Sequence, residues 1–184
     1  MEGSPMGIIE DNSEFLANDS VLGGDLNGYE WIRLADIKCL EGAKVFADEI
    51  KADDVTQGNL GNCYFVSALS KLAEKPERVK NLFESLEVSY DGKYKVKMLK
   101  DGIWTSILVD DMIPSKEGEL VFGYSRANDL WVPLVEKAAA KKFGSYKRLE
   151  SGHAIEPMAD MTGAATMRLK PTDEICWSYL LEAE

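Results

Sequence analysis

The sequence predicts an α+β domain that is mostly helical and contains a small antiparallel sheet. Three observations favour this fold class. A glycine-rich turn over residues 57–62 leads into apolar residues at helical spacing, residues 86–109 alternate between apolar and polar, and residues 130–143 form a second apolar helical pattern. The length of 184 residues suits one domain, and 45% hydrophobic residues can build a sizeable core.

The first long helix is predicted over residues 63–73. Its apolar residues recur four and three positions apart: Phe65, Leu69 and Leu72. Asn62 is a favourable N-cap residue, and Pro76 stands where this helix should stop. A short second helix is expected from about residue 76 to residue 82.

A β-meander is predicted after these helices. Apolar residues alternate over 86–90, 94–98 and 104–109, and Asp-Gly pairs at 91–92 and 101–102 separate the three segments. We expect three antiparallel strands here and a short fourth strand over 120–122.

The last predicted helix runs from about residue 130 to residue 143. Asp129 is its expected N-cap, and Gly144 should end it. Residues 1–28 are rich in Gly, Ser, Asn and Asp and show no long period, which is typical of an N-terminal extension. The folded core is therefore expected over residues 29–184, and the missing cap signal at its end suggests a chain cut from something longer.

Composition excludes several classes of function. The chain has 32 acidic against 21 basic residues, a net charge of −11, which argues against a nucleic-acid partner. No apolar run reaches the roughly 20 residues of a membrane span, and no signal peptide opens the chain. The three cysteines, Cys39, Cys63 and Cys176, form neither a disulfide framework nor a zinc motif, so we expect a reducing, cytoplasmic setting.

Cys63 is the candidate nucleophile. It stands where the glycine turn meets the helix, and the N–H groups and dipole of a helix N-terminus favour a thiolate. The alternative is a small buried hydrophobe that happens to open a helix. Gln57 lies six residues earlier, across Gly58 and Gly61, and could donate an amide N–H to a developing oxyanion; otherwise it solvates a turn.

The segment QGNLGNCYF, residues 57–65, resembles the nucleophile segment of calpain-type cysteine proteases, a branch of the papain-like enzymes. The resemblance extends to the strand pair and turn over 104–122 and to the helix over 128–141. It continues through the Ser-Tyr pair at 145–146 and the Asp-Met-Thr-Gly signature at 160–163, and covers about residues 29–181 in order. Asn62 departs from the family's usual Asp, and Tyr64 replaces a Trp.

The resemblance implies the first, nucleophile-bearing subdomain of a papain-like core. In that family the position of Cys63 is the nucleophile and the position of Gln57 is the oxyanion donor. The family's catalytic His and Asn lie in a second subdomain, well over 100 residues after the Cys, and His153 aligns with an ordinary loop position. We therefore expect a cysteine endopeptidase acting on protein substrates, inactive as this chain alone until a partner subdomain supplies His and Asn.

The resemblance also implies a calcium site. Its ligands would be the backbone carbonyls of Ala47 and Glu49 and the side chains of Asp54 and Asp129. Carboxylates from two loops suit the flexible oxygen coordination of Ca²⁺. In the family, calcium would bring the two subdomains together and assemble the catalytic residues. The alternatives are a solvated acidic face for Asp54 and a helix N-cap for Asp129.

Two other functions remain open from the sequence. The first is a non-catalytic, calpain-related regulatory or interaction module, which the intact Cys63 disfavours. The second is a calcium-responsive interaction domain.

Asp110 and Asp111 suggest another metal site but more often support a turn. Trp104 and Trp131 suit core packing better than a substrate cleft, which Tyr64 could border, and Cys39 and Cys176 are expected to be structural.

Overall fold

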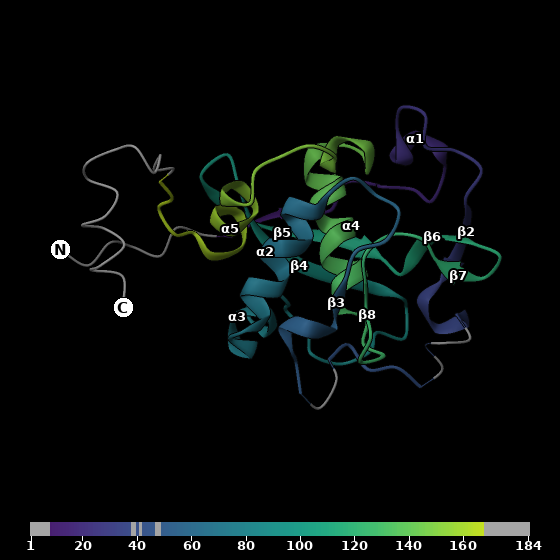
Figure 1. The fold of residues 1–184 in the computed structure, drawn as a ribbon, viewed down its shortest axis with the longest axis horizontal. Coiled ribbons are helices and arrows are strands. Elements are labelled where there is room, and N and C mark those ends of the chain that lie inside the picture. Colours follow the sequence, from purple (N-terminus) through teal and green to yellow (C-terminus); the bar gives the residue numbers. More distant parts are fainter. Residues whose placement is uncertain (1–7, 38–39, 41, 47–48, 168–184) are drawn as a thin grey trace.

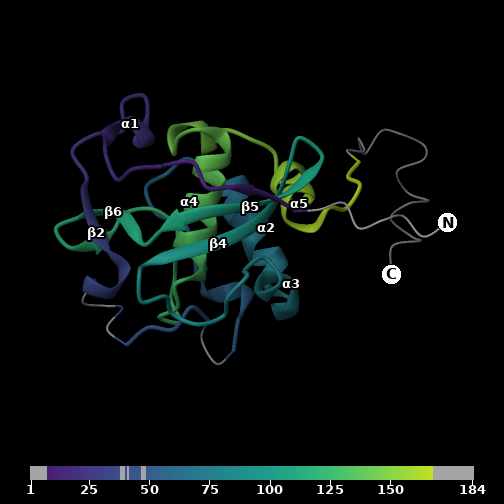
Figure 2. The same ribbon diagram turned by 180° about the vertical axis from the view of Figure 1, so that it is seen from behind.

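A computed structural model describes residues 8–37, 40, 42–46 and 49–167 of the chain. Its largest sheet is the hairpin of β4 (Lys93–Lys100) and β5 (Ile103–Asp110), with β1 (Ile9–Asp11) parallel to β5 on the other side (Figures 1 and 2). The predicted Asp-Gly turn joins β4 to β5, and both of its residues have positive φ: Asp101 at 52° and Gly102 at 79°. An Asp-Gly pair suits this turn because both residue types tolerate left-handed backbone.

Two smaller sheets connect the rest of the chain to this hairpin. β2 (Glu30–Arg33) pairs antiparallel with β6 (Met112–Lys116), which pairs in turn with β7 (Glu119–Leu120). The other sheet is a short antiparallel pair, β3 (Val55–Thr56) and β8 (Tyr124–Ser125). β3 directly precedes the glycine turn of residues 57–62 in the chain.

The described residues form the helices α1 (Asp19–Leu22), α2 (Cys63–Ala73), α3 (Pro76–Lys80), α4 (Trp131–Phe143) and α5 (Ile155–Thr162). Short 3₁₀ turns occur at Leu34–Asp36, Ala52–Asp54 and Lys147–Leu149. The central helix is α4, which is buried over almost its whole length, lies against the β4–β5 hairpin and has α2 beside it (Figures 1 and 2). None of the described helices is long and apolar enough to cross a bilayer.

Helix does not dominate the fold, contrary to the sequence prediction. Of the described residues, 33% are helix and 24% are strand. The predicted strand over 86–90 does not form, because Leu86, Val88 and Tyr90 are exposed and have no sheet face to bury. The predicted strand over 120–122 is displaced to β7, and Val121 and Phe122 are buried beyond it.

The helix ends agree with the sequence prediction except at the start of α4. Gly144 ends α4 in the left-handed conformation, with φ of 94°, and Pro76 occupies the first turn of α3. The N-cap of α4 is Leu130 and not Asp129. The backbone of Asp129 forms a β-bridge with Lys44, so the helix begins one residue later than the sequence predicts. Asn62 is the N-cap of α2 as predicted, but its side chain makes no capping bond.

The first 28 residues include two segments that pack on the core. β1 joins the main sheet, and Val21 and Leu22 of α1 are buried. Lys141 of α4 donates from Nζ to the carbonyls of Asp11 and Ser13, at 3.0 and 2.7 Å. The predicted domain boundary at residue 28 stays a prediction.

Candidate active site

Cys63 is the first residue of α2, and its side chain is an exposed free thiol. In the first turn of a helix the leading N–H groups lack an intrahelical acceptor. In α2 the Phe65 N–H is already bonded to the Asn62 carbonyl at 2.8 Å, which leaves the N–H groups of Cys63 and Tyr64 to a ligand beside the thiol. The other two cysteines, Cys39 and Cys176, lie outside the described residues, and their structural role stays a prediction. The thiol is therefore placed where the sequence predicts it.

The glycine turn (residues 57–62) is pressed against the segment that follows β7. A Cβ atom on Gly58 would lie 2.3 Å from the carbonyl oxygens of both Val121 and Phe122. The Asn59 N–H donates to the Val121 carbonyl at 2.7 Å. Only glycine allows the two backbone segments to approach this closely, and the contact fixes the position of the turn.

The side chain of Gln57 folds back toward the start of α2. Its Nε2 donates to the Leu60 carbonyl at 2.7 Å, and this bond uses one of its two N–H groups. The second N–H remains for another acceptor. The turn thus brings the amide of Gln57 to the carbonyl of Leu60, three residues before Cys63.

A buried polar cluster lies beneath the same turn, and the sequence analysis did not predict it. Asn62 is fully buried, and its Nδ2 donates to Oε1 of Glu136 at 2.7 Å. The other carboxylate oxygen of Glu136 accepts from the Gly123 N–H at 3.0 Å. Complete burial raises the pKa of the Glu136 carboxyl to about 7, against the bonds from Asn62 and Gly123, which lower it. The sequence signal that could have indicated this cluster is Glu136 itself, a glutamate within the apolar pattern of residues 130–143.

Tyr64 packs against the loop that precedes α5. A Cβ on Gly152 would lie 2.4 Å from the Tyr64 ring, and the Ser151 N–H donates to the Gly61 carbonyl at 3.2 Å. Burial, then Glu156 and Asp160, raise the pKa of the half-buried Tyr64 hydroxyl. The loop of residues 150–153 therefore borders the start of α2, a contact that the sequence did not reveal.

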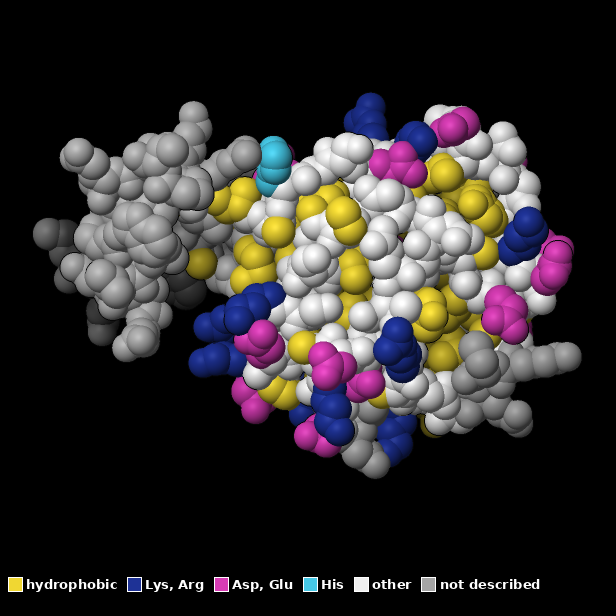
Figure 3. Space-filling view, viewed as in Figure 1, with side chains coloured by type: hydrophobic (Ala, Val, Ile, Leu, Met, Phe, Trp, Pro, Cys, Tyr) yellow, Lys and Arg dark blue, Asp and Glu magenta, His cyan; other side chains and the backbone are white. Residues whose placement is uncertain are grey.

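His153 belongs to this loop and is exposed, two residues before α5. Figure 3 shows the histidine at the surface of the molecule, on a face whose middle has few charged side chains. Its backbone carbonyl accepts the Glu156 N–H at 3.0 Å. This is the loop position that the resemblance implies for His153.

Asp110 and Asp111 have structural partners. Asp110 accepts from the buried Lys137 ammonium at 2.5 Å and from the Met112 N–H at 2.9 Å, and Asp111 pairs with Arg33 at 2.8 Å. Lys137 also donates to the Met112 carbonyl. Both carboxylates thus support the β5–β6 junction, as the turn interpretation of the sequence expects.

The two segments that carry Asp54 and Asp129 lie close together in the structure. The Arg126 N–H donates to the Asp54 carbonyl at 2.9 Å, next to the β3–β8 pair. Three residues further on, Asp129 is buried and bridges to Lys44, and the Leu130 N–H donates to the carbonyls of Lys44 and Val45.

The fit of these residues to Ca²⁺ is partial. Asp54 is half-buried on one loop and Asp129 is buried on the adjoining one. Glu49 has its side chain paired with Lys51 at 3.0 Å, and Ala47 lies outside the described residues. Within the described part of the chain, no group of three or more His, Cys, Asp or Glu side chains could hold a metal. Backbone carbonyls would have to complete the oxygen set.

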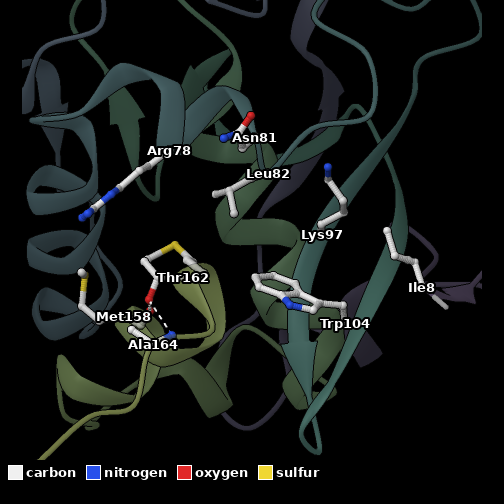
Figure 4. A pocket seen from close by; sticks show the side chains of 10 residues that line it. Ile8, Arg78, Asn81, Leu82, Lys97, Trp104, Met158, Thr162 and Ala164 are labelled. Carbon is white, nitrogen blue, oxygen red and sulfur yellow. Dashed lines mark hydrogen bonds between the residues drawn. The ribbon is translucent and has the colours of Figure 1, made fainter. Parts of the chain in front are cut away.

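A hollow of about 660 Å³ lies between α3, α5 and the β4–β5 hairpin (Figure 4). Apolar side chains line it with two cationic ones: Leu82, Trp104, Met158 and Met161, with Arg78 and Lys97. Trp131 is buried in the core as predicted, whereas Trp104 is half-buried and lines this hollow. Neither Cys63 nor Gln57 lines it, so the hollow is separate from the thiol.

Comparison with known proteins places these features in a family. The model of the calpain family of cysteine proteases matches residues 10–183. Calpain-12 of Homo sapiens is 33% identical over 169 residues, which is 85% of this chain and 23% of calpain-12. Calpain clp-1 of Caenorhabditis elegans is 35% identical over 166 residues, covering 86% of this chain and 21% of clp-1.

A plant relative matches as well. The calpain-type cysteine protease ADL1 of Oryza sativa subsp. japonica is 37% identical over 142 residues, covering 74% of this chain and 6% of ADL1. The chain therefore spans less than a quarter of the length of these relatives. The matched segment defines a cysteine-protease core of papain-like fold. The chain belongs to the calpain family of cysteine proteases.

Proposed function

We propose that the chain is the nucleophile-bearing half of a calpain-type endopeptidase, with Cys63 as the nucleophile and Gln57 as the oxyanion donor. The observation that supports this most directly is the exposed thiol at the first residue of α2, reached from Gln57 through a turn fixed by glycine contacts. Family membership makes protein chains the substrates. The free thiol suits a reducing, cytoplasmic setting.

The chemistry follows from this geometry. A histidine takes the proton of the Cys63 thiol. The sulfur then attacks the peptide carbonyl carbon and forms a C–S bond, while the carbonyl π bond breaks and its electron pair moves to the oxygen, which becomes negatively charged. The Cys63 N–H and the second N–H of Gln57 would donate to that oxygen. Collapse breaks the C–N bond, the amine leaves with a proton from a histidine, and water then hydrolyses the thioester.

We further propose that a second subdomain supplies that histidine and its orienting asparagine. The 184 residues contain one histidine, His153, on an exposed loop where the family has no catalytic group. We therefore expect this chain alone to be inactive toward peptide bonds, although its thiol should still react with small reagents. Addition of the partner subdomain should then restore proteolysis, and a non-catalytic relative would stay inactive.

Brief iodoacetamide treatment at pH 7 is expected to label Cys63 roughly tenfold faster in the folded chain than in urea, because the N–H groups of the α2 terminus stabilise negative charge on sulfur. Mass spectrometry of the intact protein and its peptides measures the rate and the site. Cys63→Ala is the control and should lose the fast phase. Equal rates in folded and unfolded chain would contradict the proposal.

We propose that Ca²⁺ binds between the loops of Asp54 and Asp129, with backbone carbonyls of Ala47 and Glu49. The adjoining backbones of the two aspartate loops support this site. Bound calcium would supply an electrostatic link that fixes these loops and, with the second subdomain present, would favour the assembled site.

Calcium at 100 times its Kd is expected to stabilise the chain by about 3 kcal/mol, because it binds only the folded state. Urea unfolding across a CaCl₂ series, with MgCl₂ for comparison, measures this effect. Asp54→Asn should abolish it, while Asp53→Asn, the exposed neighbour, should keep it. A shift that Mg²⁺ reproduces, or that Asp54→Asn retains, would instead indicate general screening of surface charge.

A further inference from the structure

Glu136 stands out among the charged groups that the mechanism does not use. It lies on α4 with only 2% of its surface exposed, and no ion pair to it occurs among the described residues. Its two carboxylate oxygens accept hydrogen bonds from two separate parts of the chain, Asn62 at 2.7 Å and the Gly123 N–H at 3.0 Å.

Both partners of Glu136 adjoin the glycine turn. Asn62 directly precedes Cys63, and its carbonyl accepts the N–H groups of Phe65 and Val66, the first hydrogen bonds of α2. Gly123 directly follows Val121 and Phe122, whose carbonyls contact Gly58, and Val121 also accepts the Asn59 N–H. The carboxyl group of Glu136 thus links two segments. One is the end of the glycine turn next to Cys63, and the other is the segment 121–123, which contacts the start of the turn next to Gln57.

The packing around this carboxyl is tight. A Cβ on Gly123 would lie 2.9 Å from Oε1 of Glu136, so a larger residue there would displace the carboxylate. The arrangement is also costly. Within the described part of the chain the carboxyl forms no ion pair, and the Oδ1 of Asn62 and the hydroxyl of Tyr146 are buried without a hydrogen-bond partner. An apolar side chain at 136 would avoid this cost, so stability alone does not account for the cluster.

We propose that Glu136 is a positioning residue for the nucleophile: through Asn62 and Gly123, its carboxyl group holds Cys63 and Gln57 in one geometry. This inference rests on the proposed function of Cys63. Without the carboxyl, Asn62 is free to rotate and the first turn of α2 frays, so its N–H groups no longer point consistently at the sulfur.

Variants at 136 separate positioning from simple stability. Glu136→Gln keeps both contacts, because its amide oxygen can accept from Gly123 and its amide nitrogen can donate to the Oδ1 of Asn62 after that side chain rotates. Glu136→Leu removes both contacts at similar volume. Leu134→Ala is the matched control, since Leu134 is a fully buried residue of the same helix and makes no hydrogen bond to the turn.

The experiment compares iodoacetamide labelling rates of Cys63 at pH 8 in the full chain, with the free energy of unfolding measured for each variant. Glu136→Leu is expected to slow labelling about fivefold, and Glu136→Gln to stay within about twofold of wild type. Leu134→Ala should lower stability and leave the rate of the folded protein unchanged. Asn62→Ala breaks the contact from the other side and should slow labelling as Glu136→Leu does, which tests the proposal even if the leucine variant fails to fold.

Three results would overturn the proposal. Fast labelling in wild type that persists in folded Glu136→Leu and in Asn62→Ala would reject the positioning role alone. A fall in rate that follows lost stability equally in Leu134→Ala would reject it too. Wild-type labelling no faster than in urea would instead reject the proposed nucleophile, and this inference with it.

Discussion

Gly58→Ala is expected to destabilise the chain by about 3 kcal/mol and to displace Gln57 from the start of α2. Its Cβ would meet the carbonyl oxygens of Val121 and Phe122 at 2.3 Å, well inside van der Waals contact. Both obstacles are backbone atoms, so no side-chain rotation relieves the clash. The turn must move outward, and the 2.7 Å bond from the Asn59 N–H to Val121 is then lost.

Gly61 provides a matched control in the same turn. A Cβ there would lie 3.5 Å from the nearest atom, in the Glu150 side chain, which is ordinary contact. Gly61→Ala should therefore change the free energy of unfolding by no more than about 0.5 kcal/mol. Urea unfolding measures both variants, and Cys63 labelling reports the geometry. Equal stability of the two would mean that the turn does not depend on its contact with residues 121–122.

The placement of Cys63 and Gln57 could be predicted because it depends on local sequence. Two glycines, an N-cap residue and an apolar period lie within about twenty consecutive residues, and each has one main structural outcome. The same holds for the turn at Asp101 and Gly102. The hairpin of β4 and β5 and the end of α4 at Gly144 were predicted for this reason.

The supporting cluster could not be predicted, because its partners are distant in sequence. Asn62 and Glu136 lie 74 positions apart, and nothing local indicates that they meet. The helical pattern predicts that charged residues of this segment face the solvent. In the structure α4 is buried on nearly every side, so Glu136 and Lys137 are buried as well. The same limit explains the absent strand at 86–90, where alternation exists but no neighbouring strand covers it.

The stability of the wild-type chain relative to Glu136→Gln is expected to fall as pH rises from 4.5 to 8. Burial raises the pKa of Glu136 to about 7 in the folded chain, from the usual 4.5 of an exposed glutamate. Between these values the folded chain retains a proton that the unfolded chain has released. The stabilisation is therefore complete below pH 4.5 and is lost as pH rises through 7.

The size of this loss is about 3 kcal/mol by linkage between the two pKa values, a large part of a typical domain's stability. Urea unfolding of both proteins at half-unit pH steps measures it, and other groups cancel in the difference. Tyr146, the titratable neighbour whose pKa burial raises well above 10, stays neutral throughout. Glu136→Leu also lacks a titratable group at this position. The stability of the wild type relative to Glu136→Leu should therefore fall with pH by the same slope as its stability relative to Glu136→Gln. A flat difference would show that Glu136 titrates alike in both states, and the carboxyl would then reach water.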